Sequence, residues 1–91
     1  MKQQSLPDRF QIGQLALSKQ GRDKNRLYVV TAKDDRFIYA ADGSKWTVAR
    51  PKKKNAAHLQ LIGITAEHQQ GEIRDADIIQ AIRAFENRKG I

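Results

Sequence analysis

Apolar and polar positions alternate along the first two thirds of the chain, in short stretches separated by polar or glycine-containing turns. In the stretch 12–18, Leu15 and Leu17 fall on one side and Gln14 and Ala16 on the other, which is the period of a β-strand. The sequence predicts five strands, at residues 12–18, 27–31, 37–41, 46–49 and 58–62. Five short strands joined by tight turns within about 50 residues favour a small barrel, because closure hides the strand edges.

The last third of the chain changes from strand period to helix period. Apolar residues follow the i, i+3, i+4, i+7 spacing of one helix face at Ile78, Ala81, Ile82 and Phe85. The sequence therefore predicts a helix at 75–90, with Asp75 as its N-cap. A helix this short needs its apolar stripe docked on another element, and we expect the barrel to provide that surface. The predicted organisation is a flexible leader at 1–9, a barrel at 10–62, a linker at 63–74 and the helix at 75–90.

Positive charge is concentrated in the predicted barrel. The 91-residue chain has a formal net charge of +7. Residues 1–62 hold thirteen basic and five acidic residues, whereas residues 63–91 hold four basic and five acidic ones. Such a field attracts polyanions, nucleic acid first and acidic membrane or protein surfaces second.

Composition narrows the classes of function further. The chain contains no cysteine, which excludes a disulfide framework and a thiolate metal site. No stretch approaches the roughly 18 apolar residues of a membrane span, and the first ten residues lack the apolar core of a secretory signal. We therefore expect a soluble cytoplasmic protein. His58 and His68 have no obvious ligand partner and no nucleophile–base arrangement stands out, so the sequence predicts neither an enzyme nor a cofactor or metal site.

Two basic segments are the candidate binding residues. They contain Lys19, Arg22, Lys24 and Arg26 in the first segment and Arg50, Lys52, Lys53 and Lys54 in the second. We expect both segments to be loops on one rim of the barrel, where together they form a phosphate-binding surface. Gly21 and Asn25 are residue types that accept positive φ, and the Asp23 side chain is suited to bonding its own backbone and holding the loop in shape. The planar fork of Arg22 grips phosphate with two bonds.

These segments carry a resemblance to a known family. The stretch GQLALSKQGRDKNRLYVV, residues 13–30, is similar to the KOW motif of RNA-binding ribosomal proteins and transcription elongation factors. Together with DGSKWTVARPKKKNAAHLQLI, it resembles the small KOW-domain RNA-binding proteins related to the archaeal-type large-subunit ribosomal protein L14e family, over residues 12–62. The resemblance implies an SH3-like barrel that binds structured RNA, usually ribosomal RNA in or near the large ribosomal subunit, in a translation-related role.

The resemblance carries over residue by residue. It matches the loop motif at Gly21, Arg22, Asp23 and Lys24, the turn at Asp42 and Gly43, and the basic segment at Arg50, Pro51, Lys52, Lys53, Lys54, Asn55 and His58. Asn25 stands where many members have a second glycine, and Asn tolerates that backbone conformation. The expected RNA-binding residues are Lys19, Gly21, Arg22, Asp23, Lys24, Arg26, Arg50, Lys52, Lys53, Lys54, Asn55 and His58.

Alternative interpretations stay open. The leading one is an RNA-binding module, and the second is a protein-interaction adaptor that uses the barrel or the C-terminal helix, with the charge only steering association. Each basic segment also fits an ordinary solvated turn. Trp46 fits a core position better than a base-stacking one, because a lone Trp in a thin domain usually packs inside.

Overall fold

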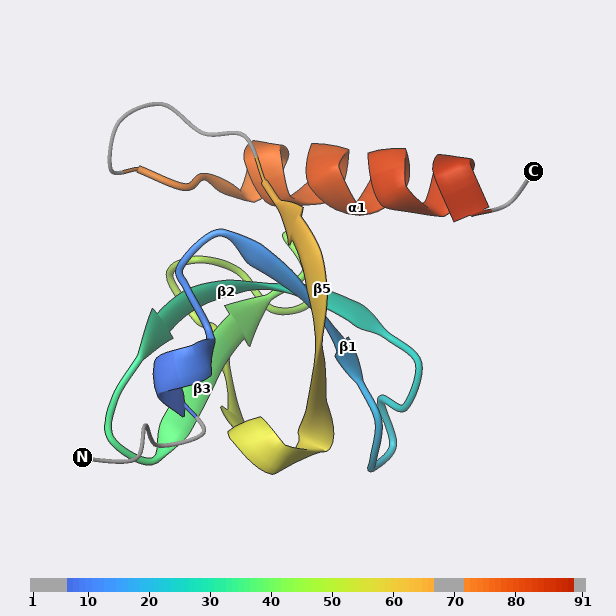
Figure 1. Cartoon of the computed structure of the whole chain (residues 1–91). Helices are drawn as coiled ribbons and strands as arrows, with labels where there is room; N and C mark the ends of the chain where they lie inside the picture. The colour runs from blue at the N-terminus through green and yellow to red at the C-terminus, as the bar shows by residue number, and fades with distance from the viewer. Residues whose placement is uncertain (1–6, 67–71, 90–91) are drawn as a thin grey trace.

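Five strands form one antiparallel sheet in the order β4-β3-β2-β1-β5 (Figure 1). The computed structural model describes residues 7–66 and 72–89. The strands are β1 (Gln14–Ser18), β2 (Leu27–Lys33), β3 (Phe37–Ala41), β4 (Lys52–Asn55) and β5 (Leu59–Thr65). The remaining elements are two 3-10 helices, η1 (Pro7–Arg9) and η2 (Ala56–His58), and helix α1 (Asp75–Lys89). The prediction of a mainly β protein with five strands and a C-terminal helix is confirmed.

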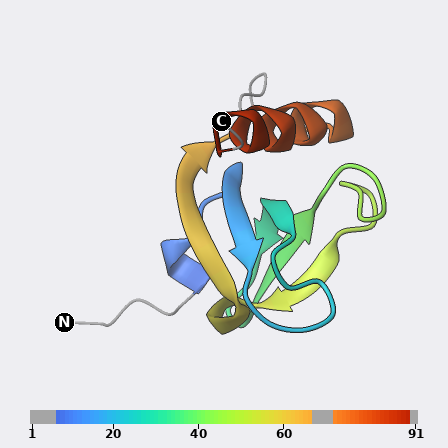
Figure 2. The same cartoon turned by 90° about the vertical axis from the view of Figure 1, so that its right-hand side faces the viewer.

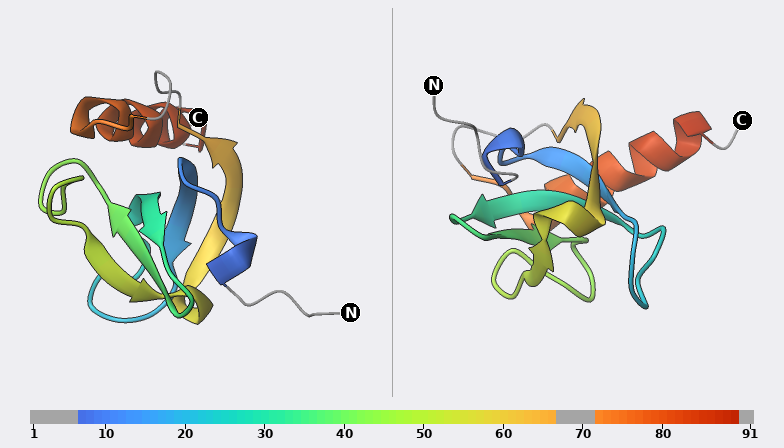
Figure 3. Two further views of the ribbon diagram at one scale, coloured as in Figure 1. Left: turned by 90° about the vertical axis from the view of Figure 1, so that its left-hand side faces the viewer. Right: turned by 60° about the horizontal axis from the view of Figure 1, so that its bottom comes forward.

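The sheet curls, and α1 lies across one end of it (Figures 2 and 3). Strands β4 and β5 are the two ends of the sheet and are joined in sequence through η2. Hydrogen-bonded pairing is shown for the neighbouring strands, from β4 through to β5. Closure of this curled sheet into an SH3-like barrel stays a prediction.

Consecutive residues of the central strands enter two separate apolar clusters. One cluster contains Phe10, Ala16, Val30, Ile38, Ala56 and Leu59. The other contains Leu15, Val29, Ala41, Ala66 and Ile78, with partly buried residues of α1 packed against it. Because α1 covers the second cluster, β1 and β2 are buried on both faces, and the strict in–out alternation of a half-exposed strand is lost there.

The strand predicted at 46–49 is wrong, and so, from Lys52 on, is the loop predicted for the second basic segment, residues 50–55. Strand β4 occupies Lys52–Asn55 and pairs with β3. Residues 46–49 belong to the β3–β4 loop (residues 42–51), which Asp42 organises: its Oδ1 accepts hydrogen bonds from Ser44 N and Trp46 N, both at 2.9 Å. These bonds hold the backbone in the loop and prevent its extension as a strand.

The β3–β4 loop fixes the N-terminal end of α1. Gly43 has a φ of 83°, which confirms the predicted tight turn. A Cβ atom at Gly43 would lie 2.6 Å from Ile79 Cγ1, so the loop backbone and the helix are in direct contact. Asp75 Oδ1 also accepts a hydrogen bond from Val48 N at 2.8 Å. The predicted docking of the helix on the β-sheet unit is therefore confirmed.

The helix begins differently from the prediction, which had Asp75 as the N-cap. Arg74 takes that position: its backbone N–H donates to Asp77 Oδ2 at 3.0 Å, and its carbonyl accepts from Ile78 N at 3.1 Å. This is the reciprocal bond of a capping box, with Asp77 three residues into the helix. Asp75 is free to bond the neighbouring loop instead.

The segments outside the sheet are only partly described. Residues 7–9 of the predicted leader form η1, in which Pro7 is buried, and residues 1–6 lie outside the described part of the chain. The predicted linker at 63–74 begins inside β5, which continues to Thr65, and its residues 67–71 also lie outside the described part. Residue 90, the end of the predicted helix, does as well.

Candidate nucleic-acid interface

The β1–β2 loop, residues 19–26, is shaped by its own backbone. Gly21 has a φ of 95° and Asn25 a φ of 75°, so both positions predicted to accept a left-handed conformation adopt it. Asn25 N donates to Ser18 O at 2.8 Å, and Arg26 N donates to Asp23 O at 2.9 Å. Backbone bonds across so short a loop fix its conformation, which is the first requirement for presenting side chains in defined directions.

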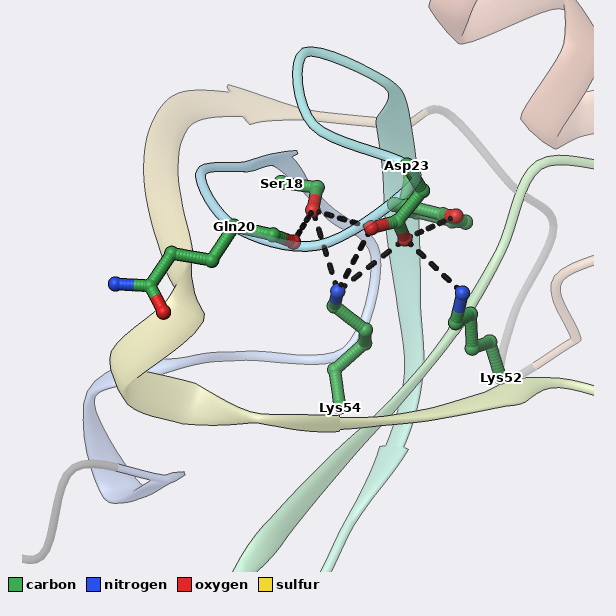
Figure 4. A network of polar contacts seen from close by, with 6 residues as sticks. Ser18, Gln20, Asp23, Lys52 and Lys54 are labelled. Carbon is green, nitrogen blue, oxygen red and sulfur yellow. Dashed lines mark hydrogen bonds and ion pairs between the residues drawn. The ribbon is translucent and has the colours of Figure 1, made fainter.

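Asp23 anchors this loop from the inside. The residue is only 7% exposed. Its carboxylate accepts hydrogen bonds from Tyr28 Oη at 2.7 Å and from Ser18 Oγ at 2.9 Å (Figure 4). Gln20 O, 3.1 Å from Ser18 Oγ, is the alternative acceptor for the single hydroxyl proton of Ser18. The loop is therefore held in shape as expected, but through side chains of β1 and β2 and not through the backbone of Asp23.

Strand β4 supplies the countercharge for Asp23. Lys54 Nζ lies 3.1 and 3.2 Å from the two carboxylate oxygens and 3.2 Å from Ser18 Oγ. Lys52 Nζ lies 3.3 Å from Asp23 Oδ2, and both lysines reach the carboxylate from the same strand (Figure 4). Part of the second basic segment therefore approaches the first through Lys52 and Lys54, but it does so as a strand and not as a second loop on a common rim. A shared buried carboxylate brings them together and offsets the repulsion between their cations.

The network keeps Asp23 ionised. Burial alone raises the pKa of this carboxyl, but the hydrogen bonds from Tyr28, Lys54, Ser18 and Lys52 together outweigh burial and hold the pKa well below its ordinary value. Burial, followed by the hydrogen bond to Asp23, raises the pKa of Tyr28 above its ordinary value. Near neutral pH Asp23 is therefore a carboxylate and Tyr28 a neutral phenol.

Four cations of the β1–β2 loop stay exposed around this buried core. They are Lys19, Arg22, Lys24 and Arg26, called here the loop cations. Asp23 is the one acidic residue among residues 19–26, and it is turned inward and paired. No carboxylate of the loop therefore offsets the loop cations, and their field reaches solvent undiminished.

The basic run of β4 divides between the two sides of the strand. Lys52 and Lys54 are two positions apart and face Asp23, with 29% and 8% of their side chains exposed. Lys53 lies between them and points the other way, with its Nζ 4.1 Å from the centroid of the Phe37 ring. Lys54 is thus a buried residue, Lys52 is partly exposed while it contacts Asp23, and Lys53 lies on the opposite side of β4 from Asp23.

The other predicted residues have mixed positions. Arg50 is exposed in the β3–β4 loop, just before Pro51. Asn55 is exposed and caps η2, with its Oδ1 accepting from Ala57 N at 2.9 Å. His58 is half-buried, and its carbonyl accepts from Lys19 N at 2.8 Å, which ties η2 to the β1–β2 loop. Gly21 is exposed in the loop itself.

Sequence reasoning missed two groups of residues at this site. Ser18 and Tyr28, which hold Asp23, flank it at equal spacing, five residues before and five after. That spacing on the two arms of a hairpin was an available signal. Trp46 and Lys45 lie at the same end of β4 as Lys52, whose Nζ is 5.3 Å from the centroid of the Trp46 ring. Nothing in the sequence pattern placed this indole beside the basic run.

The described residues form neither a metal site nor a membrane-spanning helix. Within 7–66 and 72–89, no cluster of three or more His, Cys, Asp or Glu side chains is arranged to hold a metal ion. No helix in the same ranges combines the length and the apolar character needed to cross a membrane.

No protein-family model matches this chain, and no curated protein sequence matches it either. The likeness to KOW-domain proteins therefore depends on the quoted motifs alone. The structure adds the conformation of the β1–β2 loop, which carries the GRDK motif and is held by the buried Asp23.

Proposed function

We propose that this protein binds structured RNA through the loop cations, in a ribosome-associated, translation-related role in the cytoplasm. One observation carries the proposal: a backbone-fixed loop presents four exposed cations while its one carboxylate is buried and paired with two lysines. Exposed Arg and Lys side chains are the main partners of phosphate oxygens in nucleic-acid complexes. The resemblance to KOW-domain proteins favours RNA, and ribosomal RNA in particular, among the polyanions.

The rigidity of the loop supports recognition of a folded RNA. A loop held by Asp23 and by left-handed Gly21 and Asn25 has little backbone entropy left to lose on binding. Double-helical RNA is recognised mainly by shape and through its phosphates and 2′-hydroxyls. Cations at fixed spacing suit that mode of recognition better than a flexible basic tail does.

Salt dependence of binding to ribosomal RNA tests the proposal. If the four loop cations each neutralise one phosphate, the logarithm of the association constant falls with the logarithm of salt concentration with a slope of about −3 to −4. Replacing Arg22 and Lys24 together by Ala weakens binding and reduces the slope by about 2. Filter binding across a salt series measures both quantities.

A charge-matched double variant, Arg36→Ala with Arg83→Ala, is the control. Arg36 is exposed in the turn at the far end of β2 from the β1–β2 loop, and Arg83 is exposed on α1. Figures 1 and 2 show α1 and the β1–β2 loop at opposite ends of the molecule. Equal losses of affinity in the two double variants, or a flat salt response, would contradict the proposal.

Co-sedimentation separates RNA binding from the adaptor interpretation. An RNA-binding protein sediments with large ribosomal subunits and is released by RNase. A protein that stays bound to a partner after complete RNase digestion is an adaptor, and the charge then serves only to steer association.

A further inference from the structure

The backbone of Trp46 is held within the β3–β4 loop by bonds to the turn at Asp42 and Gly43. Its carbonyl accepts hydrogen bonds from Asp42 N at 2.8 Å and from Gly43 N at 2.9 Å, and its own N–H donates to Asp42 Oδ1 at 2.9 Å. Three bonds to one short turn hold the backbone of this residue in place. The backbone from which the indole projects is therefore fixed by the fold.

The indole is not a core residue, contrary to what a lone Trp in a thin domain predicts. Trp46 is half-buried and belongs to neither apolar cluster of the described chain. Two ammonium groups lie near its ring: Lys52 Nζ is 5.3 Å and Lys45 Nζ 5.9 Å from the ring centroid. Both distances fall within the range of cation–π attraction.

One lysine links this indole to the loop cations. Lys52 Nζ is 3.3 Å from Asp23 Oδ2 in the β1–β2 loop and also lies over the Trp46 ring. The side chain of Lys52 keeps 29% of its surface exposed. Lys52 thus links the half-buried Trp46 and its neighbour Lys45 to the loop that carries the loop cations, and an aromatic ring among cations is the composition of a site for single-stranded nucleic acid.

We infer that Trp46 stacks against an unpaired base of the bound RNA, while Lys45, Lys52 and the loop cations hold the neighbouring phosphates. The inference rests on the proposed function and specifies its partner: a structured RNA with an unpaired base, such as a bulge, next to a helical stem. Bases splayed out of a stem are the elements that aromatic side chains of proteins reach in folded RNA. Each stacked base typically strengthens binding by about five- to one-hundred-fold.

The sequence supplies its own reporter, because Trp46 is the single tryptophan of the chain. Three hairpins serve as probes: one with a bulged adenosine, one with an abasic nucleotide at the bulge, and one fully paired. The first two carry the same backbone charge and differ only in the base. Tryptophan fluorescence reports stacking, and filter binding reports affinity.

The wild-type protein is expected to bind the bulged hairpin about five- to one-hundred-fold more tightly than the abasic one, with quenching of Trp46 by the bulged hairpin alone. Trp46→Leu keeps an apolar side chain and is expected to bind both hairpins with the lower, abasic affinity. Phe37→Leu is the matched control. Phe37 is also half-buried with a lysine over its ring, but it pairs with Asn55 at the opposite end of β4 from Lys52.

The failures of this inference and of the proposed function are distinguishable. If wild type binds all three hairpins equally and with steep salt dependence, RNA binding stands and base stacking is overturned. Equal discrimination by wild type and a folded Trp46→Leu variant, checked by circular dichroism, also overturns stacking. If no hairpin binds at low salt, the proposed function fails and the inference fails with it. If a proline-rich peptide quenches Trp46 fluorescence and RNA does not, the base-stacking inference is overturned in favour of a peptide-binding surface.

Discussion

The buried pair of Asp23 and Lys54 provides the sharpest test of what holds the structure together. Asp23→Asn leaves the Lys54 ammonium, in a residue only 7% exposed, without a carboxylate. Removing one member of a buried pair typically costs about 3–5 kcal/mol of unfolding free energy. Lys54→Met is expected to cost less, about 1.5–3 kcal/mol, the value for a hydrogen bond to a charged group, because Asp23 keeps Tyr28, Ser18 and Lys52.

The double variant separates coupling from two independent losses. With both charges gone, neither group is left buried and unpaired, so the combined cost should fall short of the two single costs by about 0.5–3 kcal/mol. Lys53→Met is the control on the same strand, since its ammonium lies on the other side of β4, and it should change stability by less than about 0.5 kcal/mol.

Urea unfolding followed by circular dichroism measures these differences. A domain of 91 residues has a total stability of roughly 5–14 kcal/mol, so the expected losses fall inside the measurable range. Melting temperatures should fall by about 4–8 °C per kcal/mol. Strict additivity of the two single costs, or an Asp23→Asn variant as stable as Lys53→Met, would refute the claim that this ion pair is coupled and structural.

Two further predictions concern pH and the helix contact. Because the pKa of Asp23 is lowered in the folded state, its contribution to stability is complete above the unfolded pKa of about 3.9 and is lost as the pH falls. The stability gap between wild type and Asp23→Asn should therefore narrow from about pH 5 down to pH 2 in urea titrations; a constant gap would contradict the assignment. Gly43→Ala places a Cβ 2.6 Å from Ile79 Cγ1 and 2.8 Å from Asp75 O, at a φ of 83°, and should cost about 1–3 kcal/mol. Gly63→Ala meets no atom within 4 Å and should change stability by less than about 1 kcal/mol, so equal melting temperatures would refute the contact.

Most of the fold was predictable because its elements are locally encoded. The stretches read as strands near β1, β2, β3 and β5 combine alternation with β-branched or aromatic residues, and tertiary packing agrees with that preference. Helix α1 was predicted from its apolar stripe, which does pack against the sheet. Where local preference and global packing agree, a single sequence is sufficient.

The fourth strand was not predictable for the opposite reason. The segment 46–49 has β-forming residues, but Asp42 bonds hold it in a loop. The strand is the KKKN sequence of β4, which has no apolar residue and reads as a solvated turn. Its lysines are compatible with a strand because Lys52 and Lys54 form ion pairs with Asp23, which lies about 30 residues earlier in the chain. No local pattern reveals a partner at that separation.

In the candidate site too, locally encoded features were predictable and features that depend on tertiary contacts were not. The left-handed positions Gly21 and Asn25 were predictable, because the residue types that adopt positive φ are few. The inward direction of Asp23 and Lys54 was not, because charged residues are rarely buried unless paired, and pairing is a tertiary property. Two residues of the predicted binding set thus serve to build the loop, while Trp46, for which the sequence favours a core position, is half-buried and belongs to neither apolar cluster.

The same buried pair connects stability to the proposed function. A loop of four cations without a carboxylate inside would repel itself, and its conformation would spread over many states before any ligand arrived. The hydrogen bonds to Asp23 hold the loop in one conformation against that repulsion, and Lys52 and Lys54 offset the charge of Asp23, so the outward field of the loop cations is preserved. The ordering of the loop is then achieved during folding, and little of it is left to oppose RNA binding. A basic loop can be rigid and still keep its full positive charge when its acidic residue is buried and paired with lysines of another strand, as Asp23 is with Lys52 and Lys54 of β4.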